Sequence, residues 1–230
     1  MCPTQRTRIL ILAVAGAVLW ASASVPRRAG ADDSASFARW DKAIEAFERQ
    51  DKEKPPPKHA ILFAGSSSIR RWDLPRYFPD MEVINRGFGG SEIADSVHFA
   101  PRIILKHKPR IVVLYAGDND IAAGKTPDRV FADLKAFVKA VHAPLPKTRI
   151  AFVSIKPSVL RWGLWDKMRK ANSLIEAYCK QHDRLVYIDV ARLMLGDDGK
   201  PRPELFVTDG LHLNDKGYRL WAAVIKPHLK

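Results

Sequence analysis

The sequence predicts one doubly wound α/β domain, in which helices cover both faces of a parallel sheet. Five short runs of almost continuous apolar residues have the character of strands buried on both faces, and they lie at 60–63, 83–84, 111–115, 150–154 and 185–188. The segments between them include apolar residues at helical spacing, and this alternation is typical of the α/β class. A chain of 230 residues is long enough for one such core.

The first 31 residues are predicted to be a signal peptide. Arg6 and Arg8 precede an uncharged run over 9–21, and small residues follow up to Ala23 and again up to Ala31. The run is shorter than the roughly 20 residues that span a bilayer. We expect cleavage after Ala23 or Ala31 and a secreted or periplasmic protein with no stable membrane insertion. An uncleaved anchor is the alternative interpretation.

The remaining chain, 32–230, is expected to fold as a single domain. Its first helix is indicated by apolar residues three and four apart and is ended by Pro55 to Pro57; the apolar residues are Phe37, Trp40, Ile44 and Phe47. Thr126 followed by Pro127 predicts the start of a second helix. Further helices are expected over 166–181 and 214–228.

The charge balance predicts a basic surface. The chain has 38 lysines and arginines against 25 acidic residues, a net charge of +13. Such a field favours anionic partners such as acidic glycans, lipid head groups or cell-wall polymers. Nucleic acid is not expected as a partner, because the cations are scattered and the protein is predicted to be exported.

The cysteines and histidines predict neither a disulfide nor a metal site. Cys2 lies in the segment expected to be removed, so the mature chain keeps only Cys179, which we expect to be a small core residue. The sequence has no pair of histidines at the helical spacing of metal ligands.

Polar residues follow the predicted strands in a chemically coherent set. In doubly wound sheets the reactive groups gather outside the carboxyl ends of the strands. Gly65 and the serines 66–68 follow the first run, and 85–91 follow the second. The third run is followed by 117–120, and the segment 209–214 precedes the last predicted helix.

These residues could carry out nucleophilic catalysis. A serine at a strand-to-helix turn can attack a carbonyl if a base removes its proton and donors stabilise the resulting oxyanion. His212 is the best base, because Asp209 lies three residues earlier and could orient the imidazole. Gly90 could bring its N–H close to the developing charge, and Asn119 offers a side-chain N–H.

These blocks, in this order, resemble those of the SGNH, or GDSL-like, esterases and lipases, over roughly residues 60–230. The resemblance implies a three-layer, flavodoxin-like α/β fold with a five-stranded parallel sheet. It also implies hydrolysis of carboxylic esters through an acyl-enzyme, without a cofactor. Carried over block by block, it makes Ser67 the nucleophile and Asp209 and His212 the rest of the triad. The oxyanion hole would then consist of the Ser67 N–H, Gly90 and Asn119.

One position departs from the family pattern. The usual block has aspartate between the glycine and the nucleophilic serine, where this chain has Ser66. Three serines therefore stand in a row, and Ser67 is chosen because it lies two residues after Gly65. Asp118 and Asp120 are expected to cap the next helix or hold their loop.

The substrate is predicted only as a class. Arg161 and Trp162, in the segment after the fourth strand, are candidate substrate-binding residues, although Trp162 could instead pack with Trp165. We expect a short acyl group, because no extended apolar lid stands between the blocks. The predicted function is hydrolysis of short-chain, O-acetyl-type esters in a small molecule or polymer, with acetylated carbohydrate as one candidate. The oligomeric state is not predicted.

Four alternative functions remain open at this point. Two are other activities of the same superfamily, lysophospholipase and thioesterase. The third is a pseudoenzyme that binds glycans or anions, with Ser66 as a sign of drift. The fourth is a phosphate site at serines 66–68, which would leave Asn119 and the Asp209–His212 pair unexplained.

Overall fold

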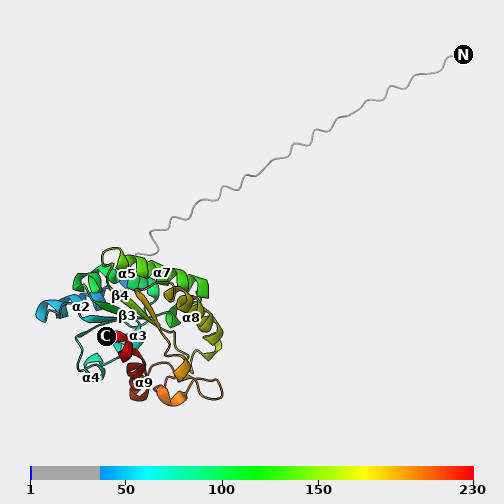
Figure 1. Cartoon of the computed structure of the whole chain (residues 1–230). Helices are drawn as coiled ribbons and strands as arrows, with labels where there is room; N and C mark the ends of the chain where they lie inside the picture. Colours follow the sequence, from blue (N-terminus) through cyan, green and yellow to red (C-terminus); the bar gives the residue numbers. More distant parts are fainter. Residues whose placement is uncertain (2–36) are drawn as a thin grey trace.

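Five parallel strands form one sheet in the order β2-β1-β3-β4-β5 (Figure 1). The computed structural model describes Met1 and residues 37–230, so the predicted signal peptide lies almost wholly outside the described residues. The strands are β1 Ile61–Gly65, β2 Val83–Gly87, β3 Ile111–Tyr115, β4 Arg149–Val153 and β5 Leu185–Ile188. With helices on both faces, this arrangement confirms the predicted three-layer, flavodoxin-like α/β fold.

Each predicted apolar run coincides with a strand, and the largest difference is at β2. The apolar run predicts a strand only over 83–84, whereas β2 continues through Asn85 and Arg86 to Gly87. The Asn85 side chain donates hydrogen bonds to the carbonyl oxygens of Ile69 and Trp72. The Arg86 guanidinium pairs with the Asp51 carboxylate. Polar side chains with such partners can be buried in a strand that hydrophobicity alone does not reveal.

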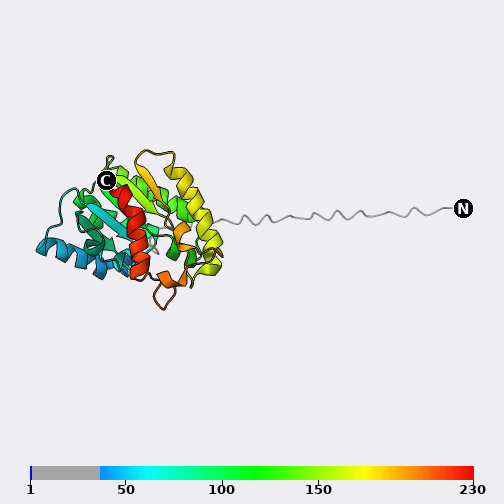
Figure 2. The same ribbon diagram turned by 60° about the horizontal axis from the view of Figure 1, so that its bottom comes forward.

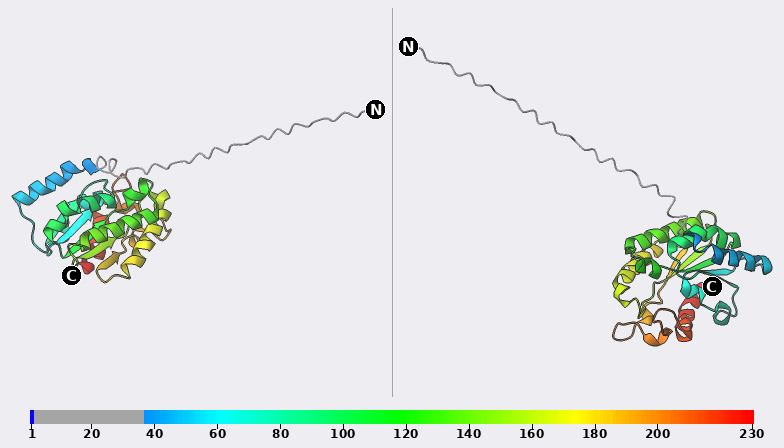
Figure 3. Two further views of the ribbon diagram at one scale, coloured as in Figure 1. Left: turned by 90° about the horizontal axis from the view of Figure 1, so that it is seen from above. Right: turned by 180° about the vertical axis from the view of Figure 1, so that it is seen from behind.

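Four longer helices cover one face of the sheet, and two of them, α5 and α7, lie above it in Figure 1. They are α2 Asp41–Glu53, α5 Ile93–Ile103, α7 Pro127–His142 and α8 Trp165–Cys179. The Thr126 hydroxyl accepts a hydrogen bond from the Arg129 N–H, and Pro127 occupies the first turn, as predicted. Cys179 is buried in this layer, in agreement with its predicted place in the core. Figure 3 shows α2, in blue, at the β2 end of the layer.

The opposite face is covered by two short helices and the C-terminal helix. These are α3 Ser67–Arg70, α4 Leu74–Tyr77 and α9 Asp215–Ile225, with α9 prominent in Figure 2. The helix predicted over 214–228 is divided, because Asn214 is the N-cap of α9 and a 3-10 turn, Lys226–Leu229, follows it. Trp221, Tyr115 and Phe63 are fully buried in this layer.

Two helices that bear on the site were not marked in the sequence. Helix α5 begins with a capping box, in which Glu92 and Asp95 each accept a hydrogen bond from the other's backbone, and it contains Pro101. An internal proline ordinarily argues against a helix, so local sequence signals do not favour α5. Helix α6, Asp118–Ala122, is a single short turn after β3. Among the described residues, no helix has both the length and the apolar character needed to cross a membrane.

We expect Gly65→Ala to destabilise the protein severely. Gly65 has φ +126°, and a Cβ at this position would overlap the Tyr115 carbonyl oxygen of β3. The free energy of unfolding should fall by about 3 kcal/mol or more, since the unfavourable φ and the overlap with the backbone both destabilise the folded state. Gly124→Ala is the matched control, because Gly124 has φ +93° with no heavy atom within 4 Å of the new Cβ. In urea unfolding, that control should lose about 1 kcal/mol of unfolding free energy. Equal losses in both variants would show that the contact with the Tyr115 carbonyl is not the cause.

Candidate active site

Ser67 is the most accessible of the three consecutive serines. It is the first residue of α3, directly beyond the carboxyl end of β1. Ser66 and Ser68 are 1% and 2% exposed, whereas Ser67 is partly exposed. The turn is fixed by its backbone, since the Ser66 N–H donates to the Tyr115 carbonyl and the Ser66 carbonyl accepts from the Ile69 and Arg70 N–H groups. A substrate can therefore reach the hydroxyl of Ser67 but not those of its neighbours.

A chain of hydrogen bonds joins Ser67, His212 and Asp209. The Nε2 atom of His212 lies 2.9 Å from the Ser67 Oγ, and its Nδ1 lies 2.6 Å from Oδ2 of Asp209. The other carboxylate oxygen of Asp209 accepts hydrogen bonds from the N–H groups of Leu211 and His212. Asp209 therefore fixes both the backbone turn and the ring orientation that aims Nε2 at the serine.

The Asp209 carboxylate stays ionised over the ordinary pH range. Burial raises the pKa of this group, but the hydrogen bonds from the His212 ring and from the two backbone N–H groups lower it by more. The pKa of Asp209 consequently lies well below its usual value. A permanent negative charge beside Nδ1 holds the proton there and would stabilise an imidazolium.

Gly90 and Asn119 are brought together by Ser91. The Asn119 Nδ2 donates to the Ser91 carbonyl oxygen at 3.0 Å, so the loop after β2 and the loop after β3 meet. Gly90 is exposed and has φ +79°. A Cβ on Gly90 would lie 3.3 Å from the Trp40 ring, which comes from the turn before α2. In the sequence, the apolar spacing of Trp40 indicates only a helix face and gives no signal of a contact with the site.

Arg161 lies against Asn119. Its guanidinium NH1 donates to the Asn119 Oδ1 at 3.0 Å and lies 3.2 Å from Oδ2 of Asp118. The N–H of Leu160 donates to the Gly210 carbonyl, so the same loop contacts the Asp209–His212 turn. Trp162 is half-buried and stacks on Trp165, with ring centroids 6.2 Å apart. Substrate contact by Arg161 and Trp162 stays a prediction.

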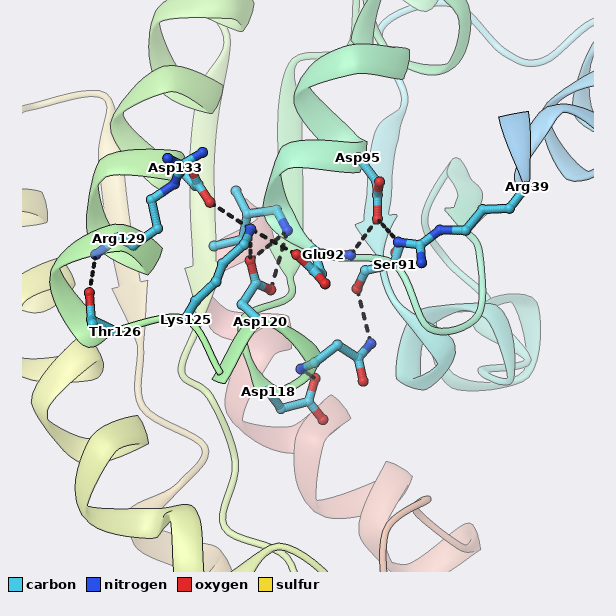
Figure 4. A network of polar contacts seen from close by, with 12 residues as sticks. Arg39, Ser91, Glu92, Asp95, Asp118, Asp120, Lys125, Thr126, Arg129 and Asp133 are labelled. Atoms are coloured by element: carbon cyan, nitrogen blue, oxygen red, sulfur yellow. Dashed lines mark hydrogen bonds and ion pairs between the residues drawn. The ribbon is translucent and has the colours of Figure 1, made fainter. Parts of the chain in front are cut away.

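Asp120 holds the loop that carries Gly90. Its carboxylate accepts hydrogen bonds from the Ile93 N–H at 3.2 and 3.3 Å and pairs with Lys125 at 3.1 Å (Figure 4). Lys125 also pairs with Glu92 and Asp133, so three carboxylates from different segments meet one ammonium group. This is the loop-holding role expected for Asp120. The sequence does not predict the roles of Glu92, Lys125 and Asp133, since the separations of Lys125 from its three carboxylates follow no helical or strand spacing.

The structure thus joins Ser67, His212 and Asp209 by hydrogen bonds and places Asn119 against Ser91, the residue that follows Gly90. The GDSL-like Lipase/Acylhydrolase family matches residues 49–220 of the sequence. The chain belongs to this GDSL-like family. Membership accounts for the order of the four blocks and makes the protein an ester hydrolase in the broad sense. Trp40 lies outside the matched range.

Individual relatives agree with this assignment. The chain is 27% identical over 187 residues to platelet-activating factor acetylhydrolase IB subunit alpha1 of Bos taurus, covering 78% of each protein. A structure from Streptococcus pneumoniae described as a platelet activating factor superposes with a TM-score of 0.75 at 21% identity, covering 86% of this chain and 96% of that one. A GDSL-like lipase from Bacteroides thetaiotaomicron gives a TM-score of 0.67 at 23% identity, covering 85% and 97%. The two structures support the fold.

Asp120 should make the stability depend on pH. Burial raises the pKa of its carboxyl to about 6, although the bonds from Lys125 and Ile93 act in the opposite direction. The folded chain then binds this proton more tightly than the unfolded chain, so protonation stabilises the fold as the pH falls. Between pH 7 and pH 4, the unfolding free energy of the wild type should rise by roughly 1–3 kcal/mol relative to that of Asp120→Asn.

The measurement is urea unfolding followed by tryptophan fluorescence at several pH values. Asp197→Asn, which removes an exposed carboxyl, is the control and should track the wild type. A difference between wild type and Asp120→Asn that does not change with pH would contradict the proposed titration.

Proposed function

We propose that this GDSL-like protein is an exported serine esterase that removes short, acetyl-type acyl groups through an acyl-enzyme. The observation that carries the proposal is the continuous hydrogen-bonded chain from Asp209 through His212 to Ser67. A surface serine without a base would be a poor nucleophile, and the 2.9 Å approach of Nε2 supplies one.

In the proposed reaction, the Ser67 oxygen attacks the ester carbonyl carbon while His212 Nε2 takes the hydroxyl proton. The tetrahedral oxyanion accepts hydrogen bonds from the Ser67 and Gly90 N–H groups and from the Asn119 amide. Collapse of this intermediate breaks the bond to the alcohol, which receives the proton from His212. Water activated by the same imidazole then attacks the acyl-enzyme and releases the carboxylic acid, so that Ser67 recovers its proton.

Two observations support a short acyl group. The Bos taurus relative is named for acetyl hydrolysis. In this chain, the Trp40 ring stands over Gly90 and limits the space beside the proposed oxyanion hole. The alcohol is proposed to belong to a small molecule or to a polymer such as acetylated carbohydrate.

A lysophospholipid substrate is the second candidate. Val159 and Leu160 are 47% and 63% exposed. The Leu160 N–H bonds to Gly210, so this apolar surface borders the turn that carries Asp209 and His212. Exposed aliphatic side chains next to a basic protein surface would suit an anionic lipid.

Export is proposed from the sequence alone, on the basic, apolar and small-residue pattern of residues 1–31. N-terminal sequencing of the protein from extracytoplasmic fractions would identify cleavage after Ala23 or Ala31. An intact Met1 on membrane-bound material would indicate an anchor instead.

Replacing Ser67 should abolish hydrolysis without loss of the fold. Ser67→Ala removes the attacking oxygen from a partly exposed position, so kcat for p-nitrophenyl acetate should fall at least about 10⁴-fold. Ser66→Ala and Ser68→Ala are matched controls in the same turn and should retain most activity. A fluorophosphonate should add to Ser67 in the wild type, as read by mass spectrometry. An adduct on Ser66 or Ser91 would show that the assigned nucleophile is wrong.

The same assay should be run with p-nitrophenyl esters of increasing chain length, with acetylated xylan and with a lysophospholipid. Activity that is greatest for acetyl esters supports the first candidate. A steady increase toward long acyl chains would favour the lipid substrate, and no turnover of any ester would overturn the proposed esterase.

The triad residues should differ in their effects on rate and on pH dependence. His212→Ala removes the base, whereas Asp209→Ala removes only its orienting partner, so the loss in kcat should be roughly tenfold or more greater for His212→Ala. In the wild type, the Asp209 carboxylate should stay charged between pH 8 and pH 5, because its hydrogen bonds hold its pKa well below the usual value, so any fall of log kcat on acidification should have a slope no greater than one. A slope of two, or equal losses in kcat for His212→Ala and Asp209→Ala, would contradict these roles.

A further inference from the structure

A buried charge cluster lies directly behind Asn119. Lys156 is 1% exposed, and its Nζ lies 3.4 Å from Oδ2 of Asp118, which is itself 4% exposed. The same carboxylate oxygen lies 3.2 Å from NH1 of Arg161, while its other oxygen accepts the Asn119 backbone N–H at 3.0 Å. Two cations therefore share one carboxylate next to the proposed oxyanion residue. The reaction described above uses none of the three charged groups.

The contacts of Asn119 leave its side-chain amide one favourable orientation. Oδ1 accepts from the Arg161 guanidinium, and Nδ2 donates one hydrogen to the Ser91 carbonyl. In the flipped orientation, Nδ2 would face the guanidinium donor and Oδ1 would face the carbonyl acceptor, so both contacts would be repulsive. Nδ2 has a second hydrogen, which is the one that an oxyanion could accept. Arg161 thus favours the orientation in which Asn119 presents a donor.

Arg161 is itself fixed from two sides. The Asp118 carboxylate pairs with its guanidinium, and Lys156 pairs with the same carboxylate from a buried position. The adjoining Leu160 N–H bonds to Gly210, which holds the Arg161 loop against the turn containing Asp209 and His212. Burial lowers the pKa of the Lys156 ammonium group, whereas the Asp118 carboxylate acts to raise it. The positive charge of Lys156 therefore depends on its contact with Asp118.

We propose that Arg161 is a positioning residue, which acts through Asn119 and holds its amide with Nδ2 ready to donate to the oxyanion. This inference rests on the proposed esterase function. It assigns Arg161 to transition-state stabilisation in place of the direct substrate contact expected from the sequence. Because the amide donor matters mainly after charge develops on the carbonyl oxygen, Arg161 should affect kcat more than KM.

The test is a double-mutant cycle on p-nitrophenyl acetate hydrolysis. Asn119→Ala should lower kcat by roughly 100-fold or more. Arg161→Ala should lower kcat by roughly tenfold with KM changed less than about twofold, since the amide remains but loses its fixed orientation. In the Asn119→Ala background, Arg161→Ala should have almost no further effect, because the group it positions is gone.

Two further variants separate positioning from general damage. Arg161→Lys retains the charge but not the planar fork that reaches Asp118 and Asn119 together, so its kcat should lie between those of wild type and Arg161→Ala. Arg169→Ala removes an exposed arginine of α8 that pairs with Asp166 and should leave both kinetic constants unchanged. Thermal unfolding shows whether each variant folds. If Arg161→Ala does not fold, the double-mutant cycle is measured with Arg161→Lys in its place.

Two results would overturn the inference. Independent, multiplicative losses in the double variant would show that Arg161 does not act through Asn119. A raised KM with unchanged kcat in Arg161→Ala would make Arg161 a substrate contact. Both results can be obtained only if the wild type is active and Asn119→Ala is impaired. If the esterase proposal itself fails, the wild type hydrolyses no ester, which is a different outcome.

Discussion

The close contact between β1 and β3 at Gly65 determines where the candidate site can form. No side chain fits there, because the Tyr115 carbonyl oxygen occupies the space that a Cβ would need. The same oxygen accepts the Ser66 N–H, and the Gly65 carbonyl accepts the Phe88 N–H from the loop after β2. One glycine therefore lets the end of β1 bond to both neighbouring segments. The turn into Ser67 and the loop carrying Gly90 are held at the same edge as a result.

Ion pairs between charged side chains also hold the segments that carry the candidate site residues. Asp118 and Asp120 lie on either side of Asn119 in sequence, and they pair with different cations. Asp120 joins its short helix to Lys125 and to the start of α5, whereas Asp118 joins it to Arg161 and Lys156. Loops bearing reactive groups often have few contacts of their own. Here, buried ion pairs supply those contacts, and each loop depends on residues remote in the chain.

The parts of this structure that sequence reasoning predicted are those with local causes. The β3 run is a continuous apolar segment, and the start of α7 is marked by Thr126 and Pro127, so both could be read from neighbouring residues. Residue type and position after the strands indicate the Asp209–His212 pair, Gly90 and Asn119, whereas the choice of Ser67 among three serines follows from the block order. The C-terminal end of β2 and the partners of Arg161 were not predictable from local sequence. Asn85 and Arg161 are positioned by contacts with residues many positions away in the chain.

The serine at position 66 illustrates why the family aspartate is dispensable to the proposed chemistry. Ser66 is 1% exposed, and within residues 37–230 its hydroxyl has no hydrogen-bond partner. A carboxylate at so buried a position would need a compensating donor or cation. The turn is held instead by the Ser66 backbone, whose N–H and carbonyl are both bonded. Ser67 therefore keeps its approach to His212 without any contribution from the side chain before it, and Ser66 alone is no evidence that catalysis has been lost.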